Sequence, residues 1–228
     1  MKNIFFIVSS FFVIISLTAQ AQITELGLQF GEMHYVGDLT VHKLGDRKEA
    51  HVAYGAFVRN TFVKGFVSLR AGFTIGKISG DDRDFTPSNS LYHRNLNFES
   101  YIQDFHAILD VNFLGISPCE RRFFTPYLSA GVSVFHFNPI ADYFGQTVNL
   151  QSLGTEGQGI DQFGNTPKYS LTQLSLPIGG GFKILCRDIF IVSLEVMYHK
   201  TMTDYLDDVS GNYYDPQIIR QYNGKTAE

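Results

Sequence analysis

The chain has 228 residues, with 21 glycines, 21 phenylalanines, 12 tyrosines and no tryptophan, and its formal net charge is −4. This acidic balance argues against a nucleic-acid-binding protein, which needs a basic patch or stripe. After residue 21 no stretch of about 18 consecutive apolar residues occurs, so the sequence contains no candidate transmembrane helix.

The first 21 residues have the features of a cleaved secretory signal peptide. Lys2 precedes an apolar run over residues 4–17, and Ala19-Gln20-Ala21 has the small-x-small pattern of a cleavage site. The run is too short to cross a bilayer as a helix. The mature protein is predicted to span residues 22–228 as one domain, in which 17 basic and 22 acidic side chains give a net charge of −5.

Seven segments alternate apolar and polar residues with period two, which predicts β-strands. In residues 66–80, for example, Val67, Leu69 and Ala71 point to one side, whereas Ser68 and Arg70 point to the other. A strand of a transmembrane β-barrel has this pattern, with its apolar face toward lipid and its polar face toward the lumen. The predicted strands are residues 24–36, 52–62, 66–80, 99–113, 127–137, 171–185 and 189–201.

The connections between these strands alternate short and long, which is typical of outer-membrane barrels. With the N-terminus in the periplasm, the shorter connections (63–65, 114–124 and 186–188) all fall on the periplasmic side. The fold expected is an all-β, up-and-down antiparallel transmembrane β-barrel. Such barrels close with an even number of strands, so eight are expected. Because residues 204–228 are polar and rich in turn formers, the chain is predicted to be truncated at the C-terminus and to lack the closing strand.

Charged side chains of both signs fall on the inward face of the predicted strands. A soluble core would not tolerate so many buried charges, whereas the narrow lumen of an eight-stranded barrel can pair them with one another and be filled by them. His106 with Asp104 and Asp110 could instead suggest acid–base chemistry or a metal, but no ligand spacing supports this. No catalytic, cofactor or metal site is predicted. The expected lumen charge network consists of Glu25, Arg59, Arg70, Asp104, His106, Asp110, Lys183 and Glu195.

The two cysteines, Cys119 and Cys186, both fall at the periplasmic ends of neighbouring predicted strands. In an oxidising compartment they are candidates for a disulfide that joins two periplasmic turns. The alternative is a pair of free thiols.

Several segments resemble, in order, the PorG-type outer-membrane barrels of Bacteroidota. The opening strand matches in ELGLQFG (25–31) and YVGDL (35–39), and the central landmarks match in HRNLNF (93–98), FTPYL (124–128) and FHFNP (135–139). The most specific matches are LQSLGTEGQG (150–159) and TDYLDDVS (203–210). The resemblance covers nearly the whole mature chain, and the missing closing strand is its one departure.

The resemblance implies a non-enzymatic outer-membrane component of the type IX secretion system. That machine exports proteins with C-terminal signals and supports gliding motility in some species. The implied partners are a periplasmic ring lipoprotein and its partner protein, together with outer-membrane lipid, and no nucleic acid or small-molecule substrate. The candidate contacts lie in the longest periplasmic turn and are Arg121, Arg122, Phe123 and Phe124.

Other interpretations remain open at this point. Phe123 and Phe124 could belong to an interfacial aromatic girdle, with Arg121 and Arg122 facing lipid headgroups. The runner-up functions are a barrel enzyme that acts on outer-membrane lipid and a general structural barrel. A lipid enzyme would need a nucleophile and a base near the outer leaflet, and no such pair stands out. A small-molecule pore conflicts with the bulky charged lumen.

Overall fold

The computed structural model describes residues 23–37, 39–40, 48–93, 96–117, 121–143, 145–158, 167–187 and 189–208. The predicted signal peptide and the segment after residue 208 lie outside these ranges. Within them the protein is all-β, with nine strands and a single α-helix, α2 (Leu150–Leu153), of four residues. In this described part of the chain no helix is long and apolar enough to cross a membrane.

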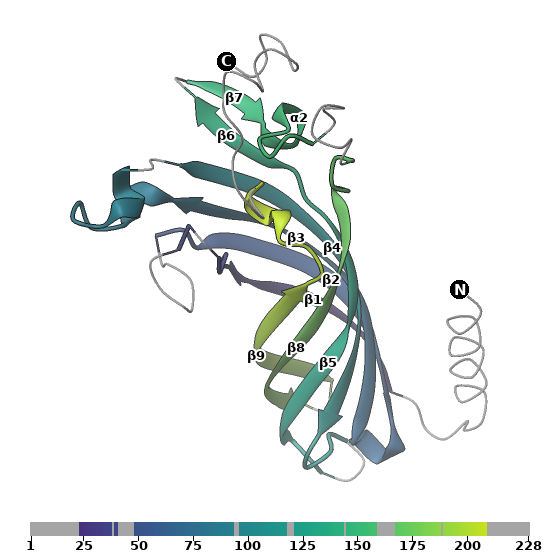
Figure 1. Cartoon of the computed structure of the whole chain (residues 1–228). Helices are drawn as coiled ribbons and strands as arrows, with labels where there is room; N and C mark the ends of the chain where they lie inside the picture. The colour runs from purple at the N-terminus through teal and green to yellow at the C-terminus, as the bar shows by residue number, and fades with distance from the viewer. Residues whose placement is uncertain are drawn as a thin grey trace.

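Seven long strands pair in chain order, each antiparallel to the next, and form one curled sheet with the shape of a half-barrel (Figure 1). Each overlaps a strand predicted from the alternation, with ends that differ by at most three residues, so this prediction is confirmed. The strands are β1 (Ile23–Met33), β2 (His51–Phe62), β3 (Val67–Asp81), β4 (Asn97–Asn112), β5 (Phe124–His136), β8 (Thr172–Cys186) and β9 (Phe190–Thr201).

Two shorter strands, β6 (Pro139–Tyr143) and β7 (Gln146–Asn149), form a hairpin within the predicted long loop 138–169. β6 also pairs with the beginning of β4, where Glu99 lies opposite Ile140. Neither PIADY nor QTVN alternates strictly between apolar and polar residues, which is why the alternation did not predict these strands. The hairpin and α2 lie together beyond the long strands (Figure 1).

The short and long connections are at opposite ends of the sheet, as predicted. The end formed by η1 (Val63–Gly65), residues 113–123 and residues 187–189 is called the turn end below. The loop end carries η2 (Asp82–Asp84), η3 (Ser90–His93), the β6–β7 hairpin, α2 and η5 (Tyr205–Asp207).

The two faces of the sheet have opposite character. On β4, exposed and buried side chains alternate without a break from Tyr101 to Asn112. The outward Phe105 is 61% exposed, whereas the inward Asp110 is fully buried. The convex face is therefore a continuous band of exposed apolar side chains, and much of the concave face is polar. This is the reverse of the distribution in a water-soluble protein.

β1 and β9 are the two edges of the seven-stranded order, and no pairing joins them in the described residues. Leu28 on β1 and Val196 on β9 are 87% and 78% exposed, more than outward residues of central strands such as Leu128 at 58%. The difference arises because an edge strand has a neighbour on one side only. Six successive antiparallel pairings also mean that β1 and β9 run in the same direction.

The interior has two zones. At the loop end, inward-facing apolar side chains form a buried core, which is called the loop-end core below. Toward the turn end the interior is filled by charged and hydroxyl side chains instead. The buried members of the loop-end core are Tyr35, Leu39, Ile78, Phe98, Ile102, Phe135 and Phe137.

Candidate functional sites in the interior and at the two ends

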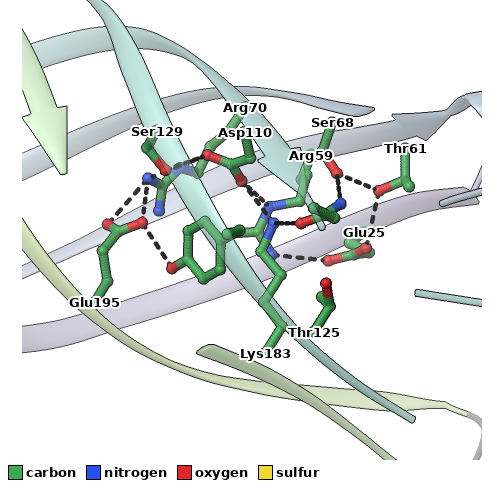
Figure 2. Close-up of polar contacts among 12 residues, drawn as sticks. Glu25, Arg59, Thr61, Ser68, Arg70, Asp110, Thr125, Ser129, Lys183 and Glu195 are labelled. Carbon is green, nitrogen blue, oxygen red and sulfur yellow. Dashed lines mark hydrogen bonds and ion pairs between the residues drawn. The ribbon is translucent and has the colours of Figure 1, made fainter. Parts of the chain in front are cut away.

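Asp110 on β4 is the centre of an ion network in the interior (Figure 2). Its buried carboxylate accepts hydrogen bonds from Lys183 Nζ and from Ser129 Oγ, both at 2.8 Å. Arg59 Nε lies 3.3 Å from the same carboxylate, and Arg70 Nη2 lies 3.9 Å from it. Three cations from three other strands therefore surround one carboxylate and compensate its charge.

Two glutamates on the edge strands complete the network. Glu25 on β1 forms an ion pair with Arg59 at 3.1 Å, and Glu195 on β9 forms one with Arg70 at 2.8 Å. Glu195 also accepts a hydrogen bond from Tyr127 Oη at 2.8 Å. Together with Asp110 and Lys183, these groups carry three positive and three negative charges. Since an unpaired buried charge is costly, equal numbers of the two signs let the six charges compensate one another.

The strand register explains both the network and its main conflict. Glu25 lies directly opposite Arg59, but Arg59 also lies directly opposite Arg70 on the next strand. Like charges in that arrangement repel each other. Both guanidinium groups lie over the ring of Phe57, with Cζ 4.7 and 5.5 Å from its centroid, and both approach Asp110. The aromatic face and the central carboxylate offset the repulsion.

Of the eight residues predicted for the lumen network, the structure brings six together. The other two, Asp104 and His106, form a separate pair with His106 Nδ1 3.0 Å from Asp104 Oδ2. His106 Nε2 is buried and has no hydrogen-bond partner in the described part of the chain. Sequence reasoning missed Tyr127 and Ser129 as partners of the network, although their position on the same face of β5 was the available signal.

A second polar cluster lies next to this pair. Ser175 Oγ is 2.6 Å from Ser133 Oγ and 3.3 Å from His199 Nδ1, and both serines are buried. This serine–histidine contact was not predicted. Among the described residues no group of three or more histidine, cysteine, aspartate or glutamate side chains could hold a metal ion.

A polar pocket of about 450 Å³ opens at the loop end between the ends of β2, β3 and β4 and the β6–β7 hairpin. Its wall groups are already paired with one another. Lys77 Nζ lies 2.8 Å from Glu99, and His51 Nε2 lies 2.6 Å from Ser79 Oγ. These pairings among the described wall residues do not define a ligand.

At the loop end, three aspartate contacts join segments that are far apart in the sequence. Tyr35 Oη, just after β1, donates to Asp207 at 2.8 Å, across 172 residues of chain. Asp208 accepts from Thr155 Oγ1 at 2.8 Å and from Tyr169 Oη at 2.5 Å. The segment that follows β9 is therefore held against the end of β1 and the long loop, so the two edges of the sheet are joined at the loop end.

Aromatic stacking and burial reinforce these contacts. The ring of Tyr169 lies between Tyr205, with centroids 4.5 Å apart, and Phe137, with centroids 6.1 Å apart. Burial raises the pKa of Asp208, although hydrogen bonds from Tyr169 and Thr155 oppose this rise. Burial, and then the charge of Asp208, raises the pKa of the Tyr169 phenol. The phenol therefore stays protonated and acts as a hydrogen-bond donor.

The four candidate partner contacts at the turn end have different environments. Phe124 points outward on β5 and stacks on Phe182, with ring centroids 5.8 Å apart, within the exposed apolar band. Arg122 pairs through its backbone with Ser117, and its guanidinium lies 4.9 Å from the ring centroid of Phe66. Phe123 and Arg121 are exposed.

These positions bear on both interpretations of the turn. Phe124 lies where a girdle residue would be, whereas Arg121 is exposed and could meet a partner. The predicted disulfide stays a prediction, because Cys119 lies outside the described residues and Cys186 is exposed at the end of β8.

The fold and its interior define a class of protein: an all-β protein built on a curled antiparallel sheet with an apolar outer face and an ion-paired inner face. The chain belongs to the family described as Domain of unknown function (DUF6089), whose model matches residues 2–223. No curated protein and no solved structure matches the chain.

Proposed function

We propose that this protein is a non-enzymatic outer-membrane β-barrel of the type IX secretion system. In this role it is exported with a cleaved signal peptide and inserted with its turn end toward the periplasm. There it anchors the ring formed by a periplasmic lipoprotein and its partner. The ring in turn serves the export of proteins with C-terminal signals and, in some species, gliding motility.

The observation that carries the membrane part of this proposal is the reversed distribution of apolar and charged side chains. Outward residues such as Leu194 and Val132 are 75% and 57% exposed, whereas inward Arg59 and Lys183 are each 1% exposed. In water so large an apolar surface promotes association. In a bilayer the same band faces hydrocarbon, and a charged lumen is normal for a transmembrane barrel.

An eighth strand between β1 and β9 is part of the proposal. Unpaired backbone groups of an edge strand cannot be satisfied by hydrocarbon, so a sheet in a membrane must close. Because β1 and β9 run in the same direction, a closing strand that is antiparallel to both gives an up-and-down barrel. The filled interior makes that barrel a closed scaffold and not an open pore.

The secretion part of the proposal rests on the resemblance to PorG-type barrels. Three of the segments that carry it, YVGDL, HRNLNF and FHFNP, meet at the loop end, where Tyr35, Phe98 and Phe135 belong to one buried core, whereas FTPYL begins β5 at the turn end. Thr155 and Asp208, from the two most specific segments, are hydrogen-bonded to each other. Segments that build one common feature support a shared fold more strongly than scattered matches do.

The test is affinity purification of the full-length protein, tagged just after residue 22, from native outer membrane. Co-purifying proteins are identified by mass spectrometry, with an unrelated tagged outer-membrane barrel as the control. We expect the ring lipoprotein and its partner in the sample and not in the control. Recovery of the barrel alone, under conditions in which the ring itself stays assembled, would refute the scaffold role.

A further inference from the structure

The three connections at the turn end share an unusual backbone feature. Each places a basic residue in the left-handed region: Lys64 with φ 55°, Arg121 with φ 55° and Arg187 with φ 52°. Of the non-glycine residues in the described part of the chain, the only others with positive φ are Val63 and Asp208. Glycine is favoured in this region because it has no Cβ, which in other residues lies too close to the following carbonyl oxygen; asparagine and aspartate are also enriched there because their side chains hydrogen-bond locally.

The three basic side chains are free to meet a partner. All three residues are exposed. Within the described ranges, no hydrogen bond or ion pair joins their side chains to another residue. Local stability therefore does not explain why lysine and arginine occupy positions that glycine would occupy without strain. Strained backbone of this kind clusters at functional sites.

The turns that carry these residues form one connected rim. The backbone N–H of Ile116 donates to the carbonyl of Gly65 at 3.1 Å, which joins the β2–β3 and β4–β5 connections. The backbone N–H of Leu185 donates to the carbonyl of Phe123 at 2.7 Å, which joins the β4–β5 connection to β8. The three cations are therefore held on neighbouring parts of a hydrogen-bonded rim.

The rim is basic on a chain that is acidic as a whole. Residues 63–65, 114–124 and 186–189 contain four basic side chains and two acidic ones, whereas residues 22–228 carry a net charge of −5. The two acidic residues, Glu120 and Asp188, lie outside the described residues. Opposite charge steers association and fixes the register of a complex, so a basic rim suits an acidic partner surface.

We propose that Lys64, Arg121 and Arg187 together form a docking surface for an acidic face of a periplasmic protein partner. This inference rests on the proposed function and names the chemistry of that contact. A protein partner fits better than lipid headgroups. Lysine and arginine reach headgroups through flexible side chains, and such contacts need no fixed backbone. Three cations on a rim of fixed backbone suit instead a protein partner whose carboxylates are also fixed in position.

The test uses the triple variant Lys64→Gly, Arg121→Gly and Arg187→Gly in the full-length protein. Glycine adopts positive φ without strain, so these changes do not weaken the turns. A second triple variant, with glutamine at the same three positions, removes the charges and keeps a polar side chain with a Cβ. The matched control also removes three positive charges, at exposed basic residues that lie away from the turn end. Its substitutions are Lys48→Gln, Arg83→Gln and Lys200→Gln.

The readout is the amount of ring lipoprotein and partner that co-purifies with each variant. The barrel is reconstituted in parallel in nanodiscs of zwitterionic phosphatidylcholine and in nanodiscs that also contain anionic lipid. We expect the amount of ring proteins recovered to fall about tenfold with each turn-end variant. With the control variant this amount should change less than about twofold. Full recovery with the glycine variant would overturn the inference and leave the proposed function standing. A loss that occurs only in membranes with anionic lipid would assign the cations to headgroups and would also overturn it. Absence of ring proteins with the unmodified protein would refute the proposed function itself.

Discussion

Replacing Asp110 by asparagine tests whether the interior is a true ion network. The substitution keeps the size of the side chain but removes the one carboxylate that Lys183, Arg59 and Arg70 share, at 2.8, 3.3 and 3.9 Å. Three buried cations would then face only the carboxylates of the two edge strands. The excess positive charge has no access to water, because Arg59, Lys183 and the site of Asp110 are almost fully buried.

Removal of one partner from a buried ion pair costs about 3–5 kcal/mol, because the remaining charge is left uncompensated. We expect Asp110→Asn to lower the free energy of unfolding by this amount. The matched control is Glu99→Gln, which breaks the Lys77–Glu99 pair at 2.8 Å, whose side chains are 28% and 41% exposed. For so exposed a pair the expected cost is below about 1 kcal/mol.

The assay is urea unfolding of the full-length protein in detergent micelles, followed by far-ultraviolet circular dichroism because the chain contains no tryptophan. If Asp110→Asn does not fold, Ser129→Ala provides a milder test, since it removes only the 2.8 Å hydrogen bond to the carboxylate. A bond to a charged group is worth about 1.5–3 kcal/mol. A loss below about 1 kcal/mol for Asp110→Asn, equal to that of Glu99→Gln, would refute the network as a stabilising feature.

Two further predictions concern the ends of the half-barrel. Tyr169→Phe removes a donor to the buried Asp208 and should lower the urea midpoint and speed proteolysis at the loop end, at a cost of about 1.5–3 kcal/mol. Burial and Asp208 raise the pKa of the Tyr169 phenol above its ordinary value of 10.0, so its contribution to stability is complete below pH 10 and declines progressively as the pH rises above 10 toward the folded-state pKa. From pH 8 to 11 the urea midpoint should therefore fall further for the unmodified protein than for Tyr169→Phe, and equal falls would contradict this. Gly65→Ala should destabilise the protein more than Gly145→Ala, although both glycines have positive φ, at 92° and 78°. A Cβ at Gly65 would lie 2.2 Å from the carbonyl oxygen of Ile116, whereas a Cβ at Gly145 would meet no described residue within 4 Å apart from its neighbours in the chain. Strain alone costs about 1–2 kcal/mol at each site, so equal losses in thermal unfolding would show that the clash at Gly65 is relieved.

The sequence determined the strands and their two faces. Alternation is a local property, because successive side chains of a strand point to opposite sides wherever the strand lies. The seven long strands could therefore be predicted to within three residues, and Glu25, Arg59 and Asp110 could be assigned to the inner face. The β6–β7 hairpin could not be predicted, since the sequences of its strands, PIADY and QTVN, do not alternate strictly between apolar and polar residues.

Only the tertiary structure decided which of those side chains meet. The register of pairing places Arg59 opposite Glu25 and Arg70, and the curl of the sheet brings Lys183 and Glu195 from distant strands to the same cluster. The contact of Tyr35 with Asp207 joins positions 172 residues apart, and no local pattern encodes such a distance. Alternation fixes the face on which a side chain lies, whereas its partners depend on how the whole sheet pairs and curves.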